Sequence, residues 1–212
     1  PQIQNQTTMP WYKILAIVSL SICLTSSLYH IIRLIRLGKP TDFSKKAGNT
    51  VQGIRYSFTG AMSPKHKESA FLHLPTYTAG LIFHLGTFLA ISLFFALLLS
   101  FEMLEPLKTV FAVFLAISGL CGIGILAKRV LSLKLRSLSS VDDYFSNIIV
   151  TSFQLITAYV LVLSDGQMAF FILSSILLLY FPLGKLKHAI YFFAARYHLG
   201  LFYGWRGTWP PK

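Results

Sequence analysis

Long apolar runs alternate with short basic segments along the 212 residues of this chain. A helix needs about 20 apolar residues to cross the hydrocarbon core of a bilayer, and five runs are at least that long. Because lipid cannot satisfy backbone polar groups, each run is expected to form a helix. We therefore predict an all-α integral membrane protein with a single transmembrane domain over residues 1–212. The predicted spans cover residues 11–35, 70–104, 107–127, 144–163 and 167–203.

The basic residues orient these spans. Seventeen of the nineteen Lys and Arg residues lie between spans one and two, between spans three and four, or in the C-terminal tail. Cytoplasmic loops carry such an excess of positive charge. We predict that the N-terminus is outside, and that the loop 36–69 and the C-terminus are cytoplasmic. The predicted location is the cytoplasmic (inner) membrane of a prokaryote, as a multi-pass protein.

The amino-acid composition further narrows the class of protein. Apolar residues make up 54% of the chain and charged residues 12%, against about 25% charged in a soluble domain. The net charge of +12 is accounted for by the cytoplasmic basic segments, so no nucleic-acid partner is expected. Cys23 and Cys121 lie inside apolar runs and lack metal or disulfide spacing. The first apolar run is too long for a cleavable signal peptide and ends in a basic cluster.

Two predicted spans are longer than a membrane requires. Span two is apolar for about 35 residues and span five for about 37, against the roughly 20 that a bilayer needs. Both extend on the cytoplasmic side, where an uncovered apolar helix is unfavourable. Either the extensions pack against the chain's own segment 33–68, or a cytoplasmic partner subunit covers them. We favour the partner.

Four histidines are arranged in a way that suggests a cofactor. His73 and His84 are eleven residues apart on span two, and His188 and His198 are ten apart on span five. At 1.5 Å per residue these separations are about 16 Å and 15 Å along the helices. Antiparallel spans can thus place His84 level with His188, and His73 level with His198. Two facing imidazoles are what bis-histidine ligation of haem iron requires.

Depth ranks the two pairs. Lys185 and Lys187 mark the cytoplasmic boundary of span five, which puts His188 at the inner edge of the membrane, together with His84. His84 and His188 are therefore the first choice as ligands, and His73 and His198 the second. The haem is expected to be b-type, because no CxxCH motif is present. Lys185 and Lys187 are candidate partners of the haem propionates, with plain interface anchoring as the alternative.

Small residues near the first pair fit the same hypothesis. Gly80 lies one turn from His84, and Gly184 one turn from His188, so a macrocycle could approach both helices. The glycines of span three, Gly119, Gly122 and Gly124, read as helix packing.

The sequence also offers candidate residues for a quinone site. Asn147, Thr151, Gln154 and Ala158 share one face of span four, which should point inward. We place the quinone near His30, Asn147 and Thr151, because a histidine with a near-neutral pKa can exchange the accompanying proton. An outer site using Glu102, Glu105 or Asp165 is the alternative.

Two stretches resemble a known family: residues 83–86 (FHLG) in span two, and residues 181–188 (FPLGKLKH), followed by Arg196-Tyr197, in span five. The chain resembles the five-span cytochrome b (gamma) subunit of respiratory nitrate reductase. It is also similar to the related membrane subunits of heterodisulfide reductase and of dissimilatory sulfite-reduction complexes. The resemblance implies electron transfer between membrane quinone and a cytoplasmic iron–sulfur partner subunit, with His84 and His188 on the haem nearer that partner.

The chain departs from the nitrate reductase pattern at two positions. The pattern places further ligands ten residues after the first histidine of span two and eighteen before the last of span five. Phe94 and Phe170 occupy those positions. We therefore expect one haem, with a second possible only at His73 and His198.

The resulting hypothesis is a haem b-containing electron-transfer subunit that is not catalytic alone. The aromatic tail 203–209 is expected to help dock the partner subunit. The alternatives are a haem-free membrane anchor or channel, in which the histidines only pack, and a small transporter.

Overall fold

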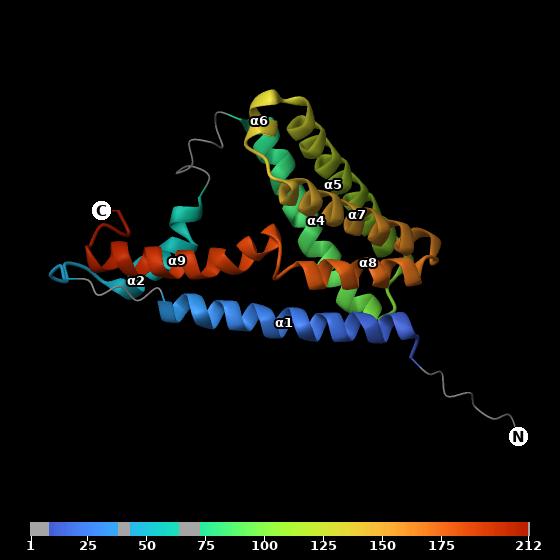
Figure 1. The fold of residues 1–212 in the computed structure, drawn as a ribbon, viewed down its shortest axis with the longest axis horizontal. Coiled ribbons are helices and arrows are strands. Elements are labelled where there is room, and N and C mark those ends of the chain that lie inside the picture. The colour runs from blue at the N-terminus through green and yellow to red at the C-terminus, as the bar shows by residue number, and fades with distance from the viewer. Residues whose placement is uncertain (1–8, 38–42, 64–72, 212) are drawn as a thin grey trace, which may run out of the picture. The chain divides into compact units, whose positions relative to one another are not determined.

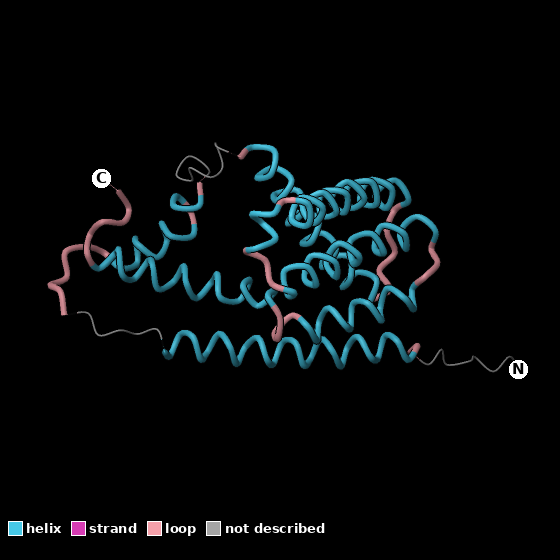
Figure 2. The backbone as a smooth tube through the Cα atoms, turned by 45° about the horizontal axis from the view of Figure 1, so that its top comes forward, coloured by secondary structure: helices cyan, strands magenta, loops and turns pink. Residues whose placement is uncertain are grey.

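The structure is a computed structural model that describes residues 9–37, 43–63 and 73–211. The described part is helical and contains no strand (Figures 1 and 2). Two short 3₁₀ helices, η1 (Gly60–Met62) and η3 (Lys185–Lys187), accompany the α-helices. The α-helices are α1 (Trp11–Leu37), α2 (Thr50–Phe58), α4 (Leu74–Leu98), α5 (Glu105–Leu131), α6 (Leu133–Ser137), α7 (Val141–Leu163), α8 (Gln167–Tyr180) and α9 (His188–Trp205).

Four helices, α1, α4, α5 and α7, are long and apolar enough to cross a membrane. A fifth span exists if α8 and α9 are counted together as one interrupted segment. The coarse prediction of an all-helical, multi-pass membrane protein is therefore confirmed.

The fifth predicted span is not the continuous helix that we expected. α8 ends at Tyr180, and α9 begins at His188 after a turn and η3. Pro182 explains the break, because proline has no N–H and its ring collides with the preceding helical turn. The amides of Leu183 and Gly184 both donate to the Tyr180 carbonyl instead, at 3.0 and 2.8 Å.

The second predicted span is also shorter than expected. α4 ends at Leu98, after 25 residues. Ser100 has a left-handed backbone (φ 54°), and the Phe101 amide donates back to the Ala96 carbonyl at 2.8 Å, which closes the helix end. α5 then starts at Glu105, with Pro106 in its first turn. The end of α4 therefore lies inside an apolar run of the sequence, because backbone hydrogen bonds form the turn that ends it.

The chain divides into two compact units, where the sequence alone suggests one domain. The first unit comprises Pro1–Cys23 and Thr78–Lys185, and the second comprises Leu24–Tyr77 and Leu186–Lys212. Each is described by itself.

In the first unit, α5 packs along α7, and α7 packs on α8. A Cβ built on Gly122 would lie 2.4 Å from Thr151 Oγ1, and one on Gly119 would lie 2.4 Å from the Leu155 side chain. The prediction of helix packing is therefore confirmed for Gly119 and Gly122, whereas no described atom lies within 4 Å of a Cβ on Gly124.

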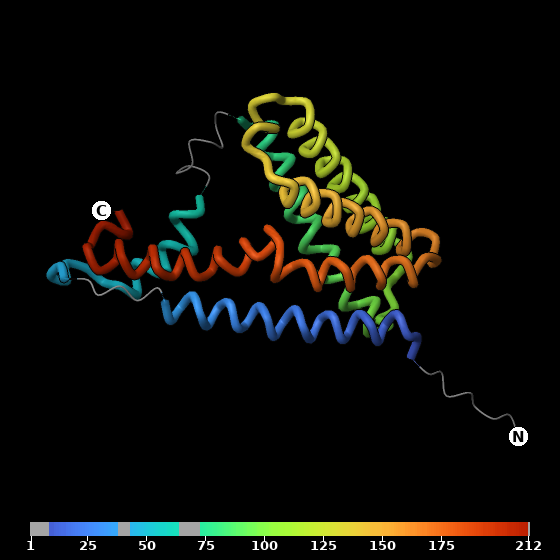
Figure 3. The backbone as a smooth tube through the Cα atoms, in the orientation of Figure 1, coloured from blue at the N-terminus to red at the C-terminus, as the bar shows by residue number. Residues whose placement is uncertain are grey.

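In the second unit, α2 lies along α9, although the two helices are far apart in sequence (Figure 3). Glycines allow the contact: a Cβ on Gly53 would lie 2.5 Å from the Gly200 carbonyl oxygen and from Gly204 Cα. The Ser57 hydroxyl also donates to the Arg196 carbonyl at 2.7 Å. The chain's own loop thus covers this face of α9, so our preference for a partner subunit there was wrong.

Candidate functional site

His84 lies on a turn of α4 that is clamped by a buried polar network in the first unit. The Gln154 amide of α7 donates to the Phe83 carbonyl at 3.0 Å and to Thr87 Oγ1 at 2.7 Å. The Ser118 hydroxyl of α5 donates to Gln154 Oε1 at 2.7 Å. Gln154 and Ser118 are fully buried. The network therefore links α4, α5 and α7 through Phe83 and Thr87, which flank His84 in the sequence. The predicted inward orientation of Gln154 on α7 is confirmed.

This network determines which way His84 points. Gly86 sits against the network, and a Cβ there would lie 2.0 Å from Ser118 Oγ, so α4 cannot rotate without a clash. His84 consequently lies on the exposed side of α4, next to Leu85 and Leu81. No atom of the described residues lies within 4 Å of a Cβ built on Gly80, one turn earlier. As far as the described residues go, Gly80 therefore offers the open surface that we predicted.

The corresponding expectation at Gly184 was wrong. A Cβ on Gly184 would lie 2.1 Å from the Tyr180 ring, so this glycine is covered by an aromatic side chain. The Tyr180 hydroxyl in turn forms a short hydrogen bond to the Asp142 carboxylate. Gly184 therefore permits the turn after α8 to fold back.

Phe94 and Phe170, at the positions where the resemblance alone would place further ligands, belong to a packed aromatic core. Their ring centroids are 6.3 Å apart, and Phe170 stacks on Phe153 at 5.8 Å. Phe171 contacts Phe94 at 6.1 Å and stacks on Tyr12 of α1 at 5.7 Å. The exposed fraction of Phe94 is 3% and that of Phe170 is 0%. Side chains fill this part of the first unit.

Lys185, a predicted propionate partner, makes an ion pair with the buried carboxylate of Asp143. Arg129 Nη1 lies 3.3 Å from the same carboxylate oxygen. Asp143 also accepts the Ser140 amide at 2.9 Å, which completes a capping box at the start of α7. The sequence argument did not anticipate this cluster, although the Ser-x-x-Asp spacing was available as a signal.

The remaining histidines belong to the second unit. His188 is the first residue of α9 and is exposed, and His73 is exposed in the turn before α4. The His30 ring contacts Tyr191 edge-on at 6.4 Å. His198 differs from these: its Nε2 is buried and has no hydrogen-bond partner, the one such side-chain atom in the described ranges. A buried, unpaired imidazole nitrogen is costly unless something binds it.

The candidate quinone residues are divided between the two units. Asn147 and Thr151 lie on α7 in the first unit, where the Thr151 hydroxyl donates to Asn147 Oδ1 at 3.3 Å, whereas His30 belongs to the second unit. Thr151 is only 6% exposed.

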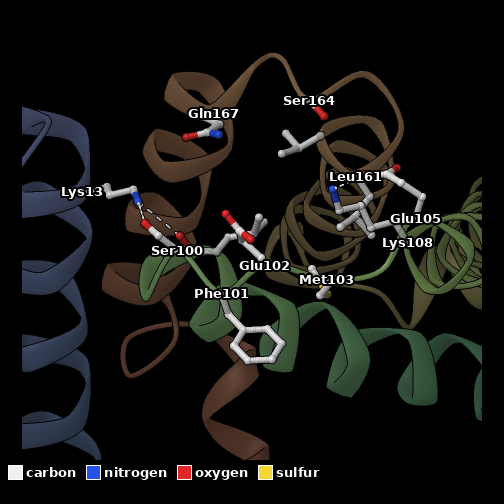
Figure 4. Close-up of a pocket in the computed structure, with 12 residues that line it drawn as sticks. Lys13, Ser100, Phe101, Glu102, Met103, Glu105, Lys108, Leu161, Ser164 and Gln167 are labelled. Atoms are coloured by element: carbon white, nitrogen blue, oxygen red, sulfur yellow. Dashed lines mark hydrogen bonds and ion pairs between the residues drawn. The ribbon is translucent and has the colours of Figure 1, made fainter.

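A cavity of about 430 Å³ lies instead at the other end of the first unit (Figure 4). Its lining includes Glu102 and Glu105, which we named for the alternative outer quinone site, but not Asp165. Lys13 reaches the cavity from α1 and donates to Ser100 Oγ at 2.8 Å and to the Leu97 carbonyl at 3.3 Å. The cavity is thus lined by carboxylate, ammonium and amide groups together with apolar side chains such as Leu97 and Phe101.

No group of three or more His, Cys, Asp or Glu side chains that could hold a metal ion occurs within residues 9–37, 43–63 and 73–211. Comparison with protein-family models, curated proteins and solved structures gave no match to this chain.

Proposed function

We propose that this chain is a haem b-binding membrane subunit that carries electrons between membrane quinone and a cytoplasmic iron–sulfur protein. The observation that supports it best is His84, which faces outward from an apolar helix beside the open surface at Gly80. A histidine within a membrane span is expensive unless it has a role. The Gln154 network satisfies the neighbouring polar groups of α4 and leaves the His84 imidazole directed away from it.

The residues fit such a cofactor at some predicted positions and not at others. His84 provides an imidazole, and Gly80 leaves space beside it among the described residues. The buried Nε2 of His198 has no hydrogen-bond partner. His188 remains the predicted ligand opposite His84 from the sequence. The positions of Phe94 and Phe170 do not fit, because their rings pack against each other. From the sequence, we keep His84 and His188 as the proposed ligands of one haem, and His73 and His198 as the second choice.

A bound haem would supply one-electron redox chemistry, and the protein would supply its position and surroundings. Gln154 and Ser118 hold α4 rigid at His84, which limits reorganisation around that ligand. Lys187 remains a candidate propionate partner. The ion pair of Lys185 with Asp143 favours anchoring of the turn after α8 over a propionate role.

For quinone, the cavity supports the outer of the two sites that the sequence left open. Ser and Gln side chains could hydrogen-bond a quinone oxygen, and Glu102 or Glu105 could accept a proton released on oxidation. The iron–sulfur partner is proposed to dock on the exposed side of α2, where Val51, Gln52 and Arg55 are exposed. The tail beyond Tyr203 is less available, since Trp209 packs on the Tyr203 ring at 4.7 Å and the Trp205 indole donates to the Ser44 carbonyl at 2.9 Å.

A reduced-minus-oxidised optical spectrum of the purified chain tests the proposal. We expect the bands of a bis-histidine b-type haem in the wild type, and loss of the same component in His84→Ala and in His188→Ala. Leu85→Ala, at the neighbouring exposed position of α4, is the matched control and should keep the full spectrum. A featureless wild-type spectrum would favour the haem-free anchor, channel or transporter.

A further inference from the structure

The second unit carries most of the positive charge of the chain. By sequence it holds twelve of the nineteen Lys and Arg residues but two of the seven Asp and Glu residues, which leaves it with ten of the twelve net positive charges. Its described residues include no Asp or Glu at all. The two carboxylates of the unit, Asp42 and Glu68, lie outside the described residues.

α9 presents two different faces within this unit. One face carries Gly200 and Gly204 and packs on α2. The opposite face is apolar and exposed, with exposed fractions of 37% at Phe192, 39% at Leu199 and 45% at Phe202. α9 is nevertheless not apolar enough to count as a span by itself. An exposed aromatic face on a basic helix of this kind is typical of helices that lie in a membrane interface.

Two arginines are stacked on the rings of the exposed face. The Arg196 guanidinium carbon lies 5.5 Å from the Phe192 ring centroid, and that of Arg206 lies 3.7 Å from the Phe202 centroid. Each pair is spaced by four residues, so both cations lie along the aromatic side of α9. Each guanidinium group, which can hydrogen-bond a phosphate through two N–H groups, thus lies beside an apolar ring.

The same unit is tied to the bilayer by the chain itself. It contains the last fourteen residues of α1 and the first residues of α4, two helices able to cross a membrane. α9 is therefore held close to the membrane surface on the side predicted to be cytoplasmic.

We propose that the aromatic face of α9, with Arg196 and Arg206, binds the headgroups of anionic phospholipids in the cytoplasmic leaflet. The Phe192 and Phe202 rings insert at the boundary between headgroups and acyl chains, and the guanidinium groups hydrogen-bond the lipid phosphates. An acidic protein surface would satisfy the charges but would not account as well for exposed phenylalanines beside each cation. The binding is independent of the proposed haem and leaves the exposed side of α2 available for a protein partner.

Competition between two lipids tests this inference. The full chain in neutral detergent is offered equal amounts of phosphatidylglycerol and phosphatidylcholine with identical acyl chains, and native mass spectrometry gives the ratio of bound lipids. We expect the wild type to bind more phosphatidylglycerol than phosphatidylcholine. In the double variant Arg196→Gln and Arg206→Gln, the ratio of the two bound lipids should fall by about fivefold for each arginine removed. The pair Arg196→Lys and Arg206→Lys should keep most of the preference.

The matched control is Lys134→Gln with Arg136→Gln on α6, which removes the same charge from the first unit. It should leave the lipid ratio unchanged, and an unchanged melting temperature shows that each variant is folded. Equal binding of both lipids by the wild type would overturn the proposal, and so would an equal loss in the control pair. The former result would point to an acidic protein as the partner instead.

Discussion

The two compact units bury their helices by different means. In the first, aromatic rings fill the core and buried side-chain polar atoms are paired, as in the network of Gln154, Ser118 and Thr87. In the second, α2 and α9 meet through glycine backbones, and the described part retains an unpaired buried nitrogen at His198. A fully satisfied core positions a helix, whereas an unsatisfied group in a tight backbone contact marks a place where a ligand would be favourable.

The largest effect is expected from closing the glycine contact of the second unit. Gly53→Val places side-chain atoms where even a Cβ would lie 2.5 Å from the α9 backbone, and backbone cannot move aside. We expect a loss of about 3 kcal/mol or more in stability of the α2–α9 contact. Protease cleavage within residues 43–63 should accelerate strongly. Gly124→Ala is the control, since no described atom lies within 4 Å of its Cβ position.

The aromatic core of the first unit should respond almost as strongly. Phe170→Ala removes a ring that is fully buried among Phe94, Phe153 and Phe171, and should destabilise the unit by about 3–5 kcal/mol. Thermal unfolding in detergent measures the change. Phe88→Ala on the exposed side of α4 should cost far less, and similar losses at both positions would mean that the core is not where we place it.

The Gln154 network predicts an intermediate effect. Gln154→Leu leaves Ser118 and Thr87 without their shared partner, so we expect a loss of about 2–3 kcal/mol. Thr157→Val, one turn further along α7, is a matched control, because its hydroxyl bonds only within the helix. If Gln154→Leu were as stable as Thr157→Val, the network would not be what holds α4 in place.

The smallest predicted change concerns the ion cluster after α8. Asp143→Asn removes the negative charge shared by Lys185 and Arg129, and should lower stability by about 1–2 kcal/mol. High salt should weaken the wild type more than the variant, which a pair of melting curves would show. Asp165→Asn, at an exposed loop position, should change little.

Much of the fold follows from hydropathy alone, and its failures have physical causes. The first, third and fourth predicted helices correspond to α1, α5 and α7, because a helix able to cross a membrane must be apolar over a set length. The ends of α4 and α8 were missed, because Ser100 and Pro182 break helices inside apolar runs that hydropathy cannot subdivide. The packing of α2 on α9 was only the less favoured of two predicted alternatives, since glycine contacts leave no hydrophobic signal.

The candidate site was predictable in its residue types more than in its partners. Intramembrane histidines are conspicuous in a sequence, and the inward face of Gln154 followed from helical spacing. The role of Asp143 as the partner of Lys185, and the unpaired Nε2 of His198, depend on which helices meet. Such contacts between distant segments cannot be read from local patterns.

The amount of extractable haem per chain tests the central claim most directly. The chain is purified from cells supplied with iron and a haem precursor, the haem is extracted as its pyridine complex, and the haem is counted against protein. We predict at least one non-covalent b-type haem per chain. If two are present, His198→Ala should remove one, whereas Tyr197→Phe, beside it on α9, should remove neither. Wild-type protein that is folded, membrane-embedded and free of haem would contradict the account.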